Sequence, residues 1–168
     1  MITDWIQLAR QINSLREDDT EIGGDSFAIQ ALDEILGNEW IETSVEYIVS
    51  FEHGGELAMN CLRHLRSTKA TKYAYQVYKS SNGERANRAV WLIKHIANPI
   101  SLDWVEEFLN DQNVILLGVD ILDQLLLTEQ IPYDEKVESL LDLADKNSNG
   151  QLKEHTDFIR EYIDKNCR

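Results

Sequence analysis

Apolar residues recur at helical spacing throughout residues 84–127, and this pattern constrains the fold more than any other feature of the sequence. Spacings of three and four residues place side chains on one side of an α-helix, whereas a half-buried strand needs strict alternation. The pattern occurs three times, and Asn98-Pro99 separates the first run from the second. The three apolar sets are Ala86, Ala89, Val90, Ile93 and Ile96; Leu102, Val105 and Leu109; and Val114, Leu117, Ile121 and Leu125. The stretch therefore predicts three helices packed in series.

The rest of the chain has the same helical character. Only two prolines and eight glycines interrupt its 168 residues, of which 43% are hydrophobic. A chain of this size and composition can bury a core without disulfides, metals or an obligate partner. We therefore expect an all-α protein that forms one domain over residues 1–168.

Capping residues and glycines mark the ends of the earlier helices. Residues 3–15 carry one apolar face and predict a first helix. Asp25 can cap a second helix, and Gly37 ends it because glycine readily adopts the left-handed conformation found after helices. A third helix follows and is expected to end at residues 53–55.

A repeat of about 30 residues connects these helices. Small residues recur at intervals of 30, 31 and 29, and aliphatic residues stand four and seven positions beyond each of them. The small residues are Ala28, Ala58, Ala89 and Gly118, and the aliphatic pairs are Leu32 and Ile35, Leu62 and Leu65, Ile93 and Ile96, and Leu122 and Leu125. A small residue lets helices approach closely, and the aliphatic pair fills the groove between units. We therefore predict a right-handed α-solenoid of about four antiparallel helix pairs in residues 25–145, with cap helices in residues 1–16 and 150–166.

Charge is strongly segregated along the chain, whose net charge is −14. Residues 1–60 hold 13 acids and 2 bases, residues 61–100 hold 1 acid and 8 bases, and residues 101–168 hold 16 acids and 6 bases. Acidic surfaces keep proteins soluble, but solubility alone does not require a basic centre between acidic ends. An acidic molecule repels nucleic acid and anionic membranes and attracts basic proteins. We therefore expect a basic protein partner and no membrane partner.

The basic centre is the best case for nucleic-acid contact, because its cations are interleaved with aromatic residues. Its members are Arg63, Arg66, Lys69, Lys72, Lys79, Arg85, Arg88 and Lys94, with Tyr73, Tyr75, Tyr78 and Trp91 between them. Acidic segments flank it on both sides, however. Pairing with acidic neighbours in the same chain, or contact with an acidic part of a partner, is therefore favoured over nucleic-acid binding.

The sequence contains no motif that points to catalysis or a cofactor. Residues 145–156 match the first half of a calcium-binding EF-hand loop, but its last position is Thr156, where calcium needs a bidentate carboxylate. The four histidines have no metal-ligand spacing, and no base is placed to activate Cys61. We expect a polar helix connection at residues 145–156, no metal and no cofactor, and no enzymatic activity.

The start of the chain and its cysteines bear on its location. Residues 1–15 lack the basic flank and unbroken apolar run of a signal peptide, and no window approaches 18 consecutive apolar residues. Cys61 and Cys167 lie far apart in sequence, which disfavours a disulfide and indicates a reducing compartment. We expect a soluble, cytoplasmic protein that is monomeric on its own.

Helix pairs with small and aliphatic residues at fixed positions resemble HEAT-type α-helical repeats, above all in residues 100–126, ISLDWVEEFLNDQNVILLGVDILDQLL. This resemblance covers about residues 25–145 and bears on fold rather than function. A small acidic helical-repeat chain without a catalytic motif is also similar to the immunity proteins of bacterial contact-dependent or polymorphic toxin systems. That second resemblance implies a non-catalytic protein that neutralises a toxin, for example a nuclease, by occlusion.

One face of a stacked helical array commonly binds other proteins. Acidic side chains on the outward sides of the helices would steer a cationic partner, and aromatic side chains would anchor it. The residues predicted to bind the partner are Glu42, Glu46, Asp103, Trp104, Glu106, Glu107, Glu138 and Asp142. Two alternatives remain open: a nucleic-acid-binding or DNA-repair protein that uses the basic centre, and a structural adaptor within a larger complex.

Overall fold

The computed structural model describes residues 3–18, 20, 22, 24–50 and 55–166, and this part of the chain is all-α, as predicted. Its elements are α1 (Trp5–Gln11), α2 (Asp25–Val49), α3 (Gly55–Leu65), α4 (Thr68–Ser80), α5 (Gly83–Ile96), the 3-10 helix η1 (Pro99–Asp103), α6 (Val105–Asn110), α7 (Ile115–Leu127), α8 (Glu135–Asn147) and α9 (Lys153–Asn166). The predicted end of the third helix at His53-Gly54 and the predicted free Cys167 lie outside the described residues.

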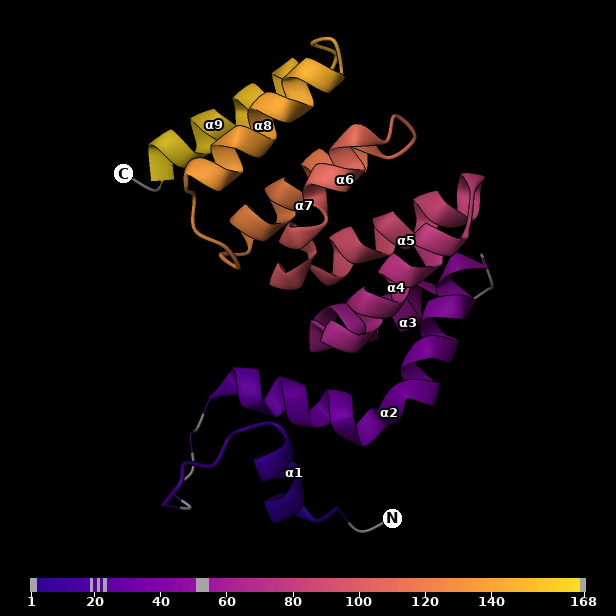
Figure 1. Ribbon diagram of the computed structural model, residues 1–168, viewed down its shortest axis with the longest axis vertical. Helices are drawn as coiled ribbons and strands as arrows, with labels where there is room; N and C mark the ends of the chain where they lie inside the picture. Colours follow the sequence, from indigo (N-terminus) through magenta and orange to yellow (C-terminus); the bar gives the residue numbers. More distant parts are fainter. Residues whose placement is uncertain (1–2, 19, 21, 23, 51–54, 167–168) are drawn as a thin grey trace.

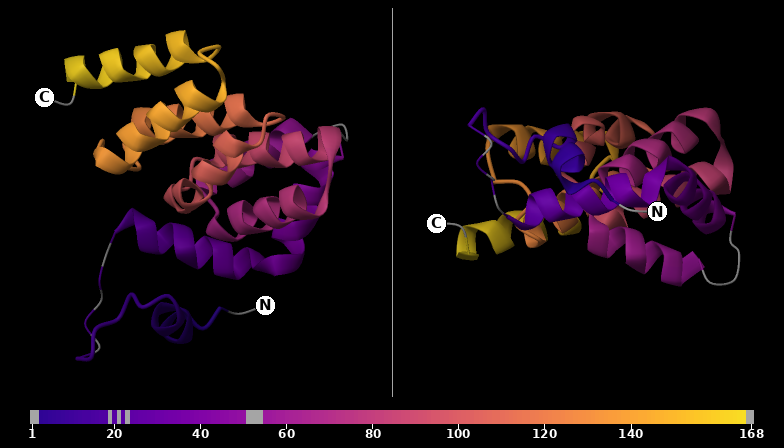
Figure 2. Two further views of the ribbon diagram at one scale, coloured as in Figure 1. Left: turned by 45° about the horizontal axis from the view of Figure 1, so that its top comes forward. Right: turned by 90° about the horizontal axis from the view of Figure 1, so that it is seen from below.

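Helices adjacent in sequence pack together, and so do alternate helices. Pairwise contacts join α2 with α3, α4 with α5, α6 with α7, and α8 with α9. Contacts also join α2 with α4 and α6 with α8 on one side, and α3 with α5, α5 with α7, and α7 with α9 on the other. The chain advances along the long axis of the molecule from α1 to α9 (Figure 1). Figure 2 shows α1 and the first half of α2 at one end and α8 and α9 at the other.

Gly37 produces a sharp kink within α2. Its backbone angles are φ 75° and ψ 165°, which L-residues with a side chain avoid. The second and third predicted helices are therefore separated at Gly37 as expected, but they follow each other without a loop. The kink lets the second half of α2 pack against the helices that follow while the first half extends toward α1 (Figure 1).

Three predictions about helix ends are wrong. Asp25 is the first residue of α2 rather than its cap, because Gly24 occupies the N-cap position without a side-chain hydrogen bond. The first helix spans only Trp5–Gln11, because Asp4 caps its start and Asn13 has left-handed angles (φ 57°) just beyond its end. The helix expected after Pro99 is divided into η1 and α6. Asn98 caps the start of η1. Its Oδ1 accepts a hydrogen bond from the Ile100 N–H (3.0 Å), and its Nδ2 donates to the Arg66 carbonyl (2.7 Å).

The core is centred on α5 and α7, and here the predicted repeat positions pack as expected. Ala89, Ile93 and Ile96 of α5 and Leu122 and Leu125 of α7 are fully buried. Gly118 lies so close to α6 that a Cβ there would come within 3.0 Å of a Leu109 methyl group and 3.2 Å of the Phe108 Cβ. The small residue thus permits close approach between helices in this part of the array.

The same prediction is wrong for the first repeat unit. Leu32 is 46% exposed and Ile35 is 41% exposed. Ala28 and Ala31 line an apolar depression against α1, but α1 is too short to cover the rest of this stripe. Within the described residues, no helix is both long and apolar enough to span a membrane.

Candidate functional site

The structure divides the eight predicted partner-binding residues among three places. Asp103 ends η1, Trp104 lies between η1 and α6, and Glu106 and Glu107 are in the first turn of α6. Glu42 and Glu46 lie on the second half of α2. Glu138 and Asp142 lie on the side of α8 that faces α9, where both form ion pairs with Arg160.

Three of these glutamates share one arrangement, in which a tyrosine and a cation bind opposite oxygens of the same carboxylate. Glu46 accepts from the Tyr73 hydroxyl (3.1 Å) and pairs with Arg85 (2.5 Å). Glu107 accepts from the Tyr75 hydroxyl and from Lys79, both at 2.5 Å. Glu138 accepts from Tyr133 and pairs with Arg160 (2.8 Å). These carboxylates therefore join neighbouring helices, a role that the sequence alone did not reveal.

The electrostatics of the Tyr75–Glu107 contact fix both protonation states near neutral pH. Burial and then the hydrogen bond to Glu107 raise the pKa of Tyr75 to about 12. Burial opposes ionisation of Glu107, but hydrogen bonds from Lys79 and Tyr75 outweigh it, so the pKa of Glu107 lies below its usual value. The tyrosine thus stays a neutral donor and the glutamate an ionised acceptor, which is a structural pairing rather than an acid–base pair.

Aromatic stacking places Trp104 in the middle of this region. Its ring lies parallel to that of Tyr75, with centroids 4.2 Å apart and planes 6° apart. The Tyr78 and Phe108 rings meet edge to face at 5.1 Å. Trp104 is half-buried rather than fully exposed, so it presents an edge to solvent while its face packs on α4. Trp40, on α2, is a second aromatic residue at the surface and is 38% exposed.

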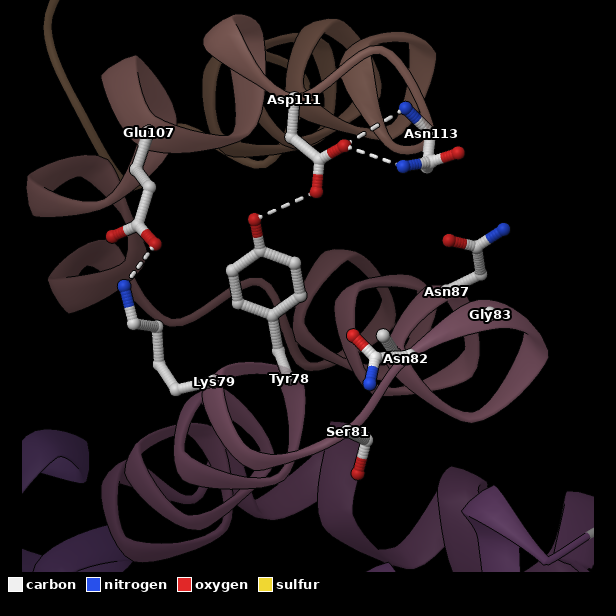
Figure 3. Close-up of a pocket in the computed structure, with 10 residues that line it drawn as sticks. Tyr78, Lys79, Ser81, Asn82, Gly83, Asn87, Glu107, Asp111 and Asn113 are labelled. Carbon is white, nitrogen blue, oxygen red and sulfur yellow. Dashed lines mark hydrogen bonds and ion pairs between the residues drawn. The ribbon is translucent and has the colours of Figure 1, made fainter.

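A pocket of about 230 Å³ adjoins Glu107, between the α4–α5 turn and the α6–α7 turn. Figure 3 shows Tyr78 and Asp111 pointing toward one another across it. The Tyr78 hydroxyl donates to Asp111 Oδ2 (3.0 Å), and the backbone and side-chain nitrogens of Asn113 both donate to Oδ1 (2.9 Å each). The Asn87 Oδ1 atom is buried and has no hydrogen-bond partner among the residues that the structure describes.

The charged side chains that line this pocket already have hydrogen-bond partners within the protein. Burial opposes ionisation of Asp111, yet hydrogen bonds from Asn113 and Tyr78 outweigh it and lower the pKa of Asp111. Burial and the hydrogen bond to Asp111 raise the pKa of Tyr78. The described lining residues therefore offer polar contacts for recognition but no free nucleophile beside a free base.

Half of the basic centre is paired with acids of the same chain. Four of its eight cations pair with carboxylates of other helices: Lys69 with Glu34, Lys79 with Glu107, Arg85 with Glu46 and Lys94 with Asp120. Arg88 stacks over Trp91 at 5.0 Å. These contacts occupy part of the basic centre, and nucleic-acid binding by the remainder stays an untested alternative.

In the segment that matches the first half of an EF-hand loop, side chains of the protein itself bind both oxygens of the Asp145 carboxylate. The Thr156 hydroxyl donates to Asp145 Oδ1 (2.6 Å), and Arg160 Nη1 donates to Asp145 Oδ2 (3.0 Å). Thr156 is itself fully buried. Its contacts tie α9 to α8. Among the described residues there is no group of three or more histidines, cysteines or carboxylates arranged to hold a metal ion.

Comparison with known proteins finds no relative: no family model matches the chain, and no curated protein or solved structure matches it. Arguments about function therefore rest on the surface and the pockets alone.

Proposed function

We propose that this chain is a non-catalytic binding protein that captures a basic protein partner and blocks it by occlusion, as the immunity proteins of bacterial toxin systems do. In this proposal the helices form a right-handed solenoid of HEAT-like pairs, capped by α1 and α9. The alternating contacts between helices support that architecture. The partner, for example a nuclease toxin, would present the cationic surface that normally receives its phosphate-bearing substrate.

The observation that carries the proposal is the pair of solvent-facing acids beside Trp104. The Asp103 side chain is 69% exposed and has only a long contact of 3.6 Å with Lys136. Glu106 is exposed, and its carboxylate has no partner within the described residues. Glu107 next to it is neutralised by Lys79, so Asp103 and Glu106 are the charges of this segment that remain available to a partner.

Two acids beside a stacked aromatic pair suit the recognition of a basic protein. Exposed charges steer association and set its rate, whereas a partly buried tryptophan provides contact area at low entropic cost. Glu42 on α2 is also exposed and would add a second, separate acidic contact. Glu46, Glu138 and Asp142 would contribute less, since they already form ion pairs within the chain.

A double variant, D103K/E106K, tests the assignment. Wild-type and variant proteins are used to capture proteins from the organism that encodes the chain, and each captured protein is purified for kinetic measurement. We expect a basic protein to bind the wild type, and the variant to associate with it about tenfold more slowly at low salt, with a smaller difference at high salt. E154K on α9 is the matched control, because Glu154 is also exposed in the first turn of a helix.

Equal association rates for D103K/E106K and E154K would contradict the assignment of this surface. Capture of acidic proteins or of nucleic acid by the wild type would contradict the proposed class of partner. Nucleic-acid capture that is lost at high salt would instead support the alternative based on the basic centre.

A further inference from the structure

A second pocket, of about 480 Å³, lies where the C-terminal ends of α3, α5 and α7 meet the start of α2. Its size is that of a small-molecule site. Two arginines and two histidines line it, together with one carboxylate, Asp25. The four basic groups are Arg63, His64, Arg66 and His95.

The two arginines differ from most other cations of the basic centre. Neither Arg63 nor Arg66 forms an ion pair within the described residues, whereas four neighbouring cations each have a carboxylate partner. The chain has 30 acidic and only 16 basic residues, so acidic partners are abundant. Two unpaired arginines around one pocket are therefore a feature of the site and not a consequence of composition.

Capping of helix ends does not account for these arginines. Basic side chains near a helix C-terminus often donate to its last carbonyls. Here several of those carbonyls have other donors, and no hydrogen bond from either guanidinium to a helix end is found within the described residues. Ser67 N–H binds the Leu62 carbonyl, Ala97 N–H binds that of Ile93, Asn98 Nδ2 binds that of Arg66, and Thr128 binds that of Gln124 through both its N–H and its hydroxyl. The guanidinium groups thus remain available to a ligand.

His95 lines the pocket beside Arg63, and the Arg63 charge is one of the effects that disfavour its protonation. Its Nδ1 lies 2.8 Å from the Trp91 carbonyl, and because a carbonyl only accepts, the proton is on Nδ1. Nε2 is then the position that gains a proton. Burial is the main cause that lowers the pKa of His95. The hydrogen bond to the Trp91 carbonyl raises it, the positive charges of Lys94 and Arg63 lower it to a lesser extent, and Asp120 raises it least. A bound anion would relieve this repulsion.

We propose that this pocket binds a small phosphate monoester, with the phosphate group held between Arg63 and Arg66 and close to His95. Guanidinium groups bind phosphate oxygens through paired hydrogen bonds, which are stronger than neutral ones. The volume exceeds what a phosphate group alone needs, and Ile29, Ile96 and Ala97 line the remainder with apolar surface for the organic part. This inference does not depend on the proposed protein partner.

The test titrates the full chain with ribose 5-phosphate, using inorganic phosphate and potassium chloride as comparisons. Binding is measured by calorimetry, and the ring signals of His64 and His95 are followed by NMR. We expect saturable binding of ribose 5-phosphate, tighter than that of inorganic phosphate, and an increase in the pKa of His95 on binding. Chloride at the same ionic strength should not reproduce this change.

Three variants make the test specific. R63Q and R66Q should each weaken binding by about tenfold, because each removes a charge-assisted hydrogen bond. K72Q removes an exposed cation outside the pocket and should bind as the wild type does. Absence of a saturable His95 shift at millimolar ligand, equal affinity for inorganic phosphate, or unchanged affinity of R63Q and R66Q in folded protein would each overturn the proposal.

Discussion

Three glutamates, Glu46, Glu107 and Glu138, each accept a hydrogen bond from a tyrosine on one carboxylate oxygen and pair with a cation on the other. The tyrosine donor has a stiff side chain, so ordering it costs less entropy than ordering a second long cation. The carboxylate is also desolvated on one side, which strengthens the hydrogen bond. Each cluster therefore stabilises the contact between helices more than an isolated surface ion pair would.

Replacement of Glu107 by Gln should lower the free energy of unfolding at neutral pH by about 1 kcal/mol or less, since the pair is partly exposed. The folded-state pKa of Glu107 is below the ordinary 4.5, so its stabilising effect is full above that pH and is lost as pH falls through the folded pKa. The difference between wild type and E107Q should thus shrink in acid. Chemical denaturation at pH 7 and pH 3 measures it.

The neighbouring substitution E106Q is the control, because the Glu106 carboxylate is exposed and unpaired within the described part of the chain. It should change stability little at either pH. Equal losses for E106Q and E107Q, or a difference for E107Q that grows in acid, would contradict the role given to the Tyr75–Glu107–Lys79 cluster.

At the level of elements, helical periodicity predicted most of the fold because apolar spacing records which side of each helix is buried. Gly118 and Gly37 were both assigned from sequence, one for close packing and one for a helix break. The 3-10 helix η1 that begins after Asn98 is not predicted from the sequence, since Asn98 is held in place by a hydrogen bond to the Arg66 carbonyl, 32 residues away. The clusters around Glu46 and Glu107 are not predicted for the same reason. The sequence shows where the charges are, but it does not show which helices pack against each other.

Gly37 offers a direct test of the kink in α2. A side chain at φ 75° and ψ 165° is strained whatever space surrounds it, and no other atom lies within 4 Å of the position its Cβ would take. Gly37→Ala should therefore lower the free energy of unfolding by about 1–3 kcal/mol through backbone strain alone. N38A, one residue along and exposed, should be neutral or slightly stabilising. A denaturation midpoint for G37A equal to that of the wild type would mean that the left-handed kink is absent.

At the scale of the whole molecule, burial is uneven along the array. Ile93 of α5 and Leu122 of α7 are completely buried, whereas Leu32, at the corresponding position of the predicted repeat, is 46% exposed. Stacked helical arrays are stabilised by contacts between neighbours, so a unit with one poorly packed face opens more easily than a central unit. The end formed by α1 and the first half of α2 should therefore be the least stable part.

Hydrogen exchange measured by mass spectrometry can follow this gradient peptide by peptide. We expect backbone amides of α5 and α7 to exchange only with global unfolding, and those of α1 and the first half of α2 to exchange faster through local opening.

The opposite end gives an internal comparison, because Ile159 and Ile163 of α9 are buried and Arg160 ties α9 to Glu138, Asp142 and Asp145 of α8. Amides of α9 should thus be better protected than those of α1. Equal protection at both ends would show that the exposed stripe of α2 has no energetic consequence. A basic partner that bound Asp103 and Glu106 should leave the exchange of α1 unchanged, whereas one that covered Leu32 and Ile35 would slow it, so the same measurement locates the partner's footprint.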